Sequence, residues 1–220
     1  YMPDPNNSNG LLFESSAKES YVDIFDISSA MGSSTDVSIA TGQGNVSEGG
    51  NITWEGGAPL DYSFSTGNLK LDASGYIKLN SDITTGTGGL TLHAGSGFVE
   101  STAGIKLNLA GDLEISNGDS NPGLPEFAAT LTGSGGLFKL GNGQLILSGE
   151  NSNWTGNTHV KEGTLKVKSD NALGSPLFST TVETGATLEL INGITIPEPI
   201  NLSGGSLVSS SGDNSLTNLI

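Results

Sequence analysis

Apolar residues recur along this chain in short bursts that alternate with polar residues. Leu69-Lys-Leu71 and Leu165-Lys-Val167 show the usual form, apolar then polar then apolar. A period of two residues predicts a β-strand with one buried side and one solvent-facing side. The strands expected from this pattern lie at residues 52–54, 69–71, 77–79, 90–92, 105–109, 113–115, 145–147, 165–167, 188–190 and 194–196.

The spacing between bursts is regular and indicates a repeat. Bursts begin near residues 69, 77, 83, 90, 98, 105 and 113, so every third burst lies 21 to 23 residues further along. Later bursts at residues 145, 165, 188 and 207 are separated by 20, 23 and 19 residues. Self-similarity at a period in this range is typical of repeat architectures.

Three short strands in each coil of about 19–23 residues predict an all-β fold, a right-handed parallel β-helix. Its narrow core would hold the apolar positions, and its tight corners would need Gly, which makes up 33 of the 220 residues, and Asn. The residues that we expect inside are Leu145, Leu147, Leu165, Val167, Leu188 and Leu190. The alternative is a β-sandwich or a meander of hairpins, which also has short strands and Asn-Gly turns such as those at 117–118, 142–143 and 192–193.

The pattern divides the chain into four parts. Residues 1–40 have few Gly and predict a lead-in or cap with an edge strand and a short helix. Residues 41–115 predict the first coils, 116–130 an irregular loop, and 131–220 further coils of one continuous solenoid. The apolar rhythm continues to the last residues, so we expect the C-terminal end to stack on another coil or on a second molecule.

The charge balance excludes several classes of partner. The chain has 23 acidic residues against eight lysines and no Arg, which gives a net charge of −15. Such a chain is repelled by nucleic acid and by anionic lipid. The lack of Cys excludes disulfides, a Cys-ligated zinc site and a thiol nucleophile. An acidic surface rich in Ser, Thr and Asn favours an extracellular location.

A longer motif lies in "GSGGLFKLGNGQLILSGENSNWTGNTHVKEGTLKV", residues 133–167. It resembles the passenger-associated repeat of bacterial autotransporters, and the likeness continues through "DNALGS" and "VETGATLEL" over residues 131–205. The positions that carry it are Gly136, Leu137, Lys139, Gly141, Gly143, Leu145, Leu147, Gly149, Asn151, Trp154, Gly156, Thr158, Gly163, Thr164 and Leu165.

Upstream, residues 49–95 are similar to coils of filamentous-haemagglutinin-type exoproteins in their Leu-x-Leu and Gly rhythm. Both resemblances imply a secreted β-helical stalk, in families with many adhesins. They imply an extracellular or outer-membrane-associated location and partners among glycans or proteins on host or neighbouring cells. The export route stays open between autotransport and two-partner secretion.

Sequence motifs for catalysis are lacking. Neither His93 nor His159 has partners at a metal-ligand spacing, and no Gly-x-Ser-x-Gly elbow or phosphate loop occurs. Because β-helices also host polysaccharide-degrading enzymes, a pair of carboxylates was considered, with Asp72 and Asp112 brought together by stacking. The candidate carboxylates are Asp61, Asp72, Asp82, Asp112 and Glu114.

Ligand binding has two further candidates. Four aromatic residues would stack on sugars if they were exposed, and would otherwise pack in the core or at corners: Trp54, Tyr62, Tyr76 and Trp154. Oxygen ligands in "NGDSNPG", residues 117–123, give a calcium hypothesis near Asp119, although the full calcium-loop spacing is lacking. No other cofactor or metal is expected.

The sequence therefore predicts a structural and adhesive segment of a surface-displayed β-solenoid, which acts as a rigid stalk and binding surface. Two alternatives stay open at this point: a self-assembling extracellular fibre or sheath subunit, and a β-helical enzyme that degrades polysaccharide. We expect no catalysis, because Arg, Cys and any nucleophile–base spacing are lacking.

Overall fold

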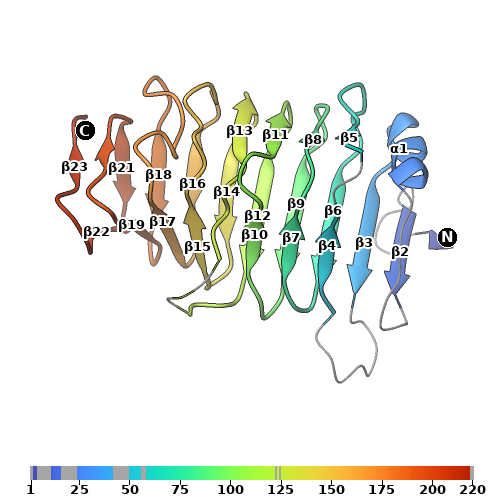
Figure 1. The fold of residues 1–220 in the computed structure, drawn as a ribbon, viewed down its shortest axis with the longest axis horizontal. Coiled ribbons are helices and arrows are strands. Elements are labelled where there is room, and N and C mark those ends of the chain that lie inside the picture. The colour runs from blue at the N-terminus through green and yellow to red at the C-terminus, as the bar shows by residue number, and fades with distance from the viewer. Residues whose placement is uncertain are drawn as a thin grey trace.

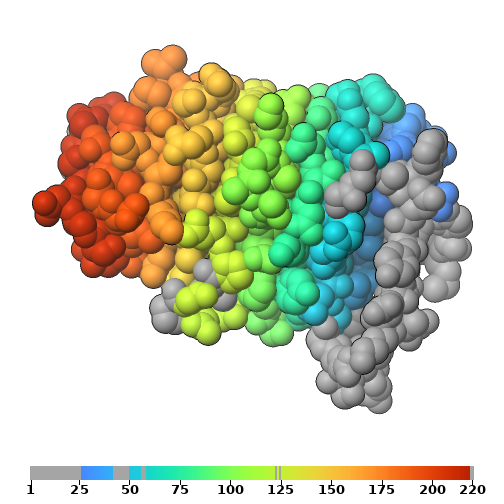
Figure 2. All heavy atoms as spheres, viewed as in Figure 1, coloured from blue at the N-terminus to red at the C-terminus, as the bar shows by residue number. Residues whose placement is uncertain are grey.

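The computed structural model describes residues 2–3, 11–15, 24–41, 50–55, 58–121, 123 and 125–218. The chain winds into about seven stacked coils, and almost all strand pairs are parallel (Figure 1). The coils follow one another in chain order along the long axis, so the space-filling view shows successive colour bands (Figure 2). The prediction of a parallel β-helix is confirmed, and the hairpin alternative is wrong because neighbouring strands belong to successive coils.

One sheet of ten strands forms the first face of the helix and runs along the whole stack. Its strands, in spatial order, are β1 (Met2–Pro3), β2 (Leu11–Ser15), β3 (Val37–Thr41), β6 (Leu69–Ala73), β9 (Leu90–Ala94), β12 (Leu113–Asn117), β14 (Leu137–Leu140), β16 (Thr158–Val160), β18 (Thr180–Glu183) and β21 (Ile200–Ser203).

The second face is made of two sheets joined by Phe127, which bridges Ser101 to Leu147. Its strands are β4 (Ile52–Trp54), β7 (Ile77–Leu79) and β10 (Val99–Ser101), then β15 (Gln144–Leu147), β17 (Thr164–Val167), β19 (Thr187–Leu190) and β22 (Ser206–Ser209).

The third face is the most interrupted. It holds β5 (Leu60–Asp61), β8 (Ile83–Thr84), β11 (Lys106–Leu109) and β13 (Thr130–Gly133), and later β20 (Thr195–Ile196) and β23 (Ser215–Leu216). Between these two groups, Trp154 continues the face through a bridge to Gly133.

Strand register gives the length of each coil. Leu69 pairs with Leu90, Leu90 with Leu113, and Leu113 with Leu137, so these coils are 21, 23 and 24 residues long. Thr158 pairs with Thr180. The observed coils therefore agree with the predicted length to within about one residue.

The core is a narrow column of side chains from alternate strand positions. In β6 and β9 every second residue is buried, which is the period-two pattern of a sheet with one wet side. All six residues that were predicted inside are buried: Leu145, Leu147, Leu165, Val167, Leu188 and Leu190. Each buried Leu contributes about 2 kcal/mol of hydrophobic free energy.

A column of glycines allows the coils to stack closely at the corner before the first face. A Cβ atom on Gly135 would lie 1.9 Å from the Gly111 carbonyl oxygen, and one on Gly111 would lie 2.2 Å from that of Gly88. No side chain fits at these distances, so the backbones approach each other only because the residues are glycine.

The lead-in contains one helix, α1 (Ile24–Gly32), whose Ile27 and Met31 are buried in the same hydrophobic core as the coils. In Figure 1, α1 lies at the N-terminal end of the stack. Within the described residues, no helix has the length and apolar character needed to cross a membrane. The four domain boundaries given above stay predictions.

Candidate ligand-binding groove

The lysine of the repeat motif points inward. In β14, Lys139 shares its side of the strand with Leu137 and is fully buried. Its Nζ donates hydrogen bonds to the carbonyl oxygens of Leu140 (2.7 Å), Gly141 (2.8 Å) and Glu162 (3.3 Å). Burial lowers the pKa of Lys139 to about 8. The expectation that lysines face outward is wrong here, because this ammonium binds corner carbonyls inside the coil.

Two other motif residues join neighbouring coils. Asn151 Oδ1 accepts a hydrogen bond from Leu131 N, and its Nδ2 donates one to Ala172 O, both at 2.7 Å. Trp154 Nε1 donates to Gly135 O at 2.8 Å. Asn151 and Trp154 are fully buried. The conserved-looking spacing of the motif therefore serves coil stacking, and its side chains do not reach the surface.

Three of the four aromatic candidates for ligand contact are buried. Trp54 is 8% exposed, and Tyr62 and Trp154 are 0% exposed, so the prediction that they face a ligand is wrong. Their rings fill the core, and burial raises the pKa of the Tyr62 phenol. Tyr76 is half-buried and stacks on Phe98 with ring centroids 5.1 Å apart, so its ligand role stays a prediction.

A second aromatic stack lies on the outer side of the first face. Phe138 and His159 occupy paired positions of β14 and β16, and their ring centroids are 4.9 Å apart. Lys161 Nζ lies 5.1 Å from the centre of the Phe138 ring, within the range of a cation–π contact. His159 is thus part of a surface stack that only the strand register brings together.

The carboxylates considered for catalysis are held apart. Asp72 is aligned with His93 and Ser116, whereas Asp112 lies four residues before Ser116. This offset alone separates the two along the strand by about 13 Å. The proposed pairing of Asp72 with Asp112 is therefore wrong.

Each of these carboxylates has a local partner. Asp72 contacts Lys70 Nζ at 2.6 Å and His93 Nδ1 at 2.7 Å. Burial alone would raise the pKa of Asp72, but these two hydrogen bonds outweigh burial and lower it. The other four accept hydrogen bonds from the next coil or from the same turn: Asp61 from Ser63 N, Asp82 from Lys106 N, Asp112 from Gly136 N and Glu114 from Thr91 Oγ1.

Asp119, the residue of the calcium hypothesis, accepts a hydrogen bond from Asn121 N. Within the part of the chain that the structure describes, no group of three or more His, Asp or Glu side chains is arranged to hold a metal ion. Calcium at Asp119 stays a prediction.

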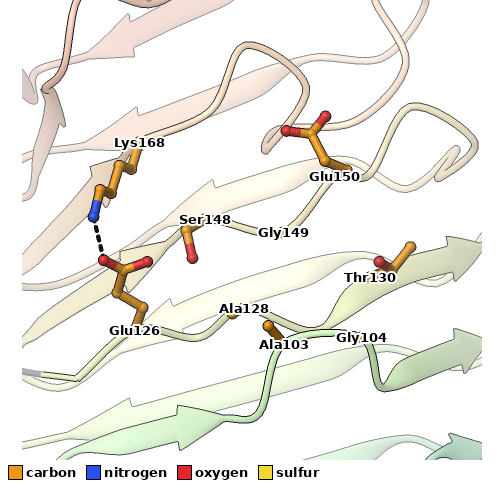
Figure 3. Close-up of a pocket in the computed structure, with 9 residues that line it drawn as sticks. All are labelled: Ala103, Gly104, Glu126, Ala128, Thr130, Ser148, Gly149, Glu150 and Lys168. Carbon is orange, nitrogen blue, oxygen red and sulfur yellow. Dashed lines mark hydrogen bonds and ion pairs between the residues drawn. The ribbon is translucent and has the colours of Figure 1, made fainter.

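An open groove of about 450 Å³ crosses the corner between the second and third faces (Figure 3). Four successive coils contribute to it. Small residues form much of its lining: Ala103, Gly104, Ala128 and Gly149. Polar and charged side chains complete it: Glu126, Thr130, Ser148, Glu150 and Lys168.

Register explains how one side of the groove is built. The pairs Phe127–Leu147 and Leu147–Val167 place Ala128, Ser148 and Lys168 in one column across three coils. Because Ala128 and Ser148 are short, the Lys168 side chain extends back over them and forms an ion pair with Glu126 (Figure 3). The hydrogen bond from Lys168 lowers the pKa of Glu126.

Glu150 lies on the other side of the groove (Figure 3). Its carboxylate accepts hydrogen bonds from Ser169 Oγ at 2.6 Å and from Asn171 Nδ2 at 3.0 Å, and these bonds lower its pKa. Gly149 beside it has no space for a side chain, since a Cβ there would lie 2.0 Å from Ala129 O. Two oriented carboxylates therefore flank a floor of small residues.

Sequence reasoning missed this groove. Glu126 and Lys168 are 42 residues apart, and no local motif marks either of them. Coil lengths of 20 to 24 residues would have placed them two coils apart, but the irregular segment before Glu126 hides the register there.

Comparisons with known proteins agree with the fold. Residues 137–167 match the family model described as the passenger-associated transport repeat. A stretch of 110 residues, 48% of this chain, is 33% identical to the adhesin BmaC autotransporter of Brucella suis biovar 1 (strain 1330). The chain spans 3% of the length of that relative. No solved structure gives a significant match. The chain is thus a parallel β-helix that carries an autotransporter passenger-associated transport repeat over residues 137–167.

Proposed function

We propose that this chain is a rigid adhesive segment of a protein exported to the bacterial cell surface. The observation that carries the proposal is the direction of the repeat residues. Lys139, Asn151 and Trp154 are spent on stacking one coil on the next. The outer side chains are thereby left free for contact with other molecules.

Its mechanism is geometric. One ten-stranded sheet runs along the stack, so bending the rod would require many backbone hydrogen bonds to be strained together. The net charge of −15 adds repulsion from anionic membrane surfaces. Stiffness and repulsion both favour a stalk that holds its outer surface away from the cell. The named activity of the Brucella relative, adhesion, supports the same role.

A display experiment tests the adhesive role. The 220-residue segment would be coupled to beads at one end, and bead attachment to cultured epithelial cells would be counted against beads that carry a β-helix of equal length from a non-adhesive protein. We expect attachment above that control. Attachment equal to the control on every cell type tried would contradict the adhesive role and leave a spacer role.

Self-association is a second candidate function, supported by one observation. Leu202 and Val208 in the last coil are 46% and 41% exposed, although they are apolar. A head-to-tail contact that covers them would produce open filaments. Sedimentation velocity over a hundredfold range of concentration tests this, and Leu202→Ser with Val208→Ser should abolish any association. A single monomeric species throughout would rule it out.

A further inference from the structure

We propose that the groove between Glu126 and Glu150 binds a neutral saccharide. This inference deepens the adhesive role proposed above and rests on it. The groove combines fixed acceptors, nearby donors and a small apolar floor, all on the outside of the rod (Figure 3).

The acceptors are oriented before any ligand arrives. Lys168 holds Glu126 from one side, and Ser169 with Asn171 hold Glu150. An ionised carboxylate has about four lone-pair positions, so each retains acceptor capacity toward the groove. Orientation in advance reduces the entropy lost when a ligand is bound. Two fixed carboxylates suit a ligand with several hydroxyl donors.

Donors lie among the acceptors. Lys168 Nζ and the Thr130 hydroxyl both line the groove and can donate to a ligand oxygen. A sugar hydroxyl both donates and accepts, so it matches this mixture better than a group that only donates. The floor of Ala103, Gly104, Ala128 and Gly149 offers carbon atoms and backbone to the C–H side of a sugar ring.

Charge argues against the other ligand classes. Two carboxylates and a net charge of −15 repel an acidic saccharide or a nucleic acid. A strongly basic segment meets Lys168 inside the groove. A purely apolar ligand would strip water from three charged groups without replacing it. A volume of about 450 Å³ lies in the usual range for small-ligand sites.

The test is a titration of the ¹⁵N-labelled 220-residue protein, followed by amide chemical shifts. The neutral probes are lactose, maltose, cellobiose and N,N′-diacetylchitobiose. The charged probes are a heparin disaccharide and tetralysine. We expect at least one neutral disaccharide to give saturable shifts at Ala128 and Thr130 with a Kd on the order of 1 mM. No response to any neutral probe, or shifts with tetralysine alone, would overturn the proposal.

Variants separate binding from folding. Ala128 is an outward position, so Ala128→Trp should fill the groove without entering the core and abolish the shifts. Glu150→Gln keeps the shape of the side chain and should weaken binding about tenfold, because a charged acceptor is replaced by a neutral one. Thr181→Trp, on the outer side of β18, is the matched control and should bind as the parent does. Equal binding by Ala128→Trp and the parent would place the saccharide elsewhere.

The bead assay distinguishes this proposal from the adhesive role itself. If Ala128→Trp beads attach as well as the parent, the adhesive role stands and the groove is not its binding site. If the parent binds a disaccharide in the groove but its beads do not attach, the saccharide site stands and the adhesive role fails.

Discussion

Trp154 donates its indole N–H to the carbonyl oxygen of Gly135 in the preceding coil, at 2.8 Å, and its ring is fully buried. The same glycine belongs to the column that lets the backbones approach each other, and a Cβ on Gly156 would lie 2.0 Å from that same oxygen. One corner therefore joins a close backbone contact, a buried ring and a hydrogen bond.

Removal of only the indole N–H should destabilise this corner. Trp154→Phe keeps an aromatic ring but leaves the Gly135 carbonyl without its donor, at a cost of about 1–3 kcal/mol, and adds the loss of ring volume. The free energy of unfolding from urea titration gives the cost. Tyr76→Phe, at a half-buried ring on the surface, is the control. Equal stabilities of Trp154→Phe and the parent would show that the hydrogen bond contributes nothing.

The glycine column makes a sharper prediction. Gly135→Ala puts a Cβ where only 1.9 Å separates it from the Gly111 carbonyl oxygen, so two coils must move apart. We expect a loss of more than about 2 kcal/mol. Ser134→Ala, at the exposed neighbouring position, should change stability by less than about 0.5 kcal/mol. Thermal unfolding of the two variants side by side checks this, and similar midpoints would contradict close stacking.

The inward register of β15 predicts unequal effects for two nearby substitutions. Leu147→Asp places an unpaired charge in a column of apolar side chains and should destabilise by several kcal/mol, about 3 or more, or prevent folding. Lys166 faces outward and forms an ion pair with Glu189 at 3.3 Å. Lys166→Ala should cost at most about 1 kcal/mol. Small and equal losses for both would mean that the register is wrong.

Glu198 predicts an unusual dependence of stability on pH. It is 1% exposed, and neither carboxylate oxygen has a hydrogen-bond partner among the residues that the structure describes. Burial raises its pKa to about 7 from the ordinary 4.5. Between these two values the folded state binds more protons than the unfolded state, so stability falls as the pH rises from 4.5 to 7.

The variant Glu198→Gln isolates this effect. The parent should lose about 2 kcal/mol of unfolding free energy between pH 5 and pH 8, and the variant should lose almost none. Asp72, Glu126 and Glu150 have lowered pKa values, so their contributions disappear only at more acidic pH and leave this window clear. Identical pH profiles for the parent and Glu198→Gln would refute the assignment.

The separation of the carboxylates predicts no glycosidase activity. Incubation with neutral and acidic polysaccharides should release no fragments, because Asp72 and Asp112 lie too far apart to act on one bond. Reducing-end assays and mass spectrometry check this. A product that disappears in Asp72→Asn would show a catalytic site that uses another partner.

The sequence was sufficient to predict the fold because two periods coincide. Alternation within strands predicts which residues are inside, and the spacing of bursts predicts the coil. The strands of the first face were harder to find in the second half of the chain. In β16 and β18 the inward positions include Thr158 and Thr180, which are buried and stacked on each other, so a search for apolar bursts does not find them.

The candidate site was much less predictable. Trp154 was expected on the surface because an aromatic residue among Asn, Thr and Gly resembles an exposed loop, and only the stacked coils show that it closes the core. Lys139 was misplaced because a charge was assumed to face water, whereas three carbonyl oxygens compensate it inside. The groove depends on contacts between coils, which local sequence does not encode.

The inward direction of Lys139, Asn151 and Trp154 also governs what an immune system meets. An antibody against the folded rod contacts outer side chains, and substitutions at such surface positions usually change stability by less than about 0.5 kcal/mol. The residues that the fold requires are hidden from it. A rod built in this way can therefore change its antigenic surface while the buried repeat, and with it the shape of the protein, stays the same.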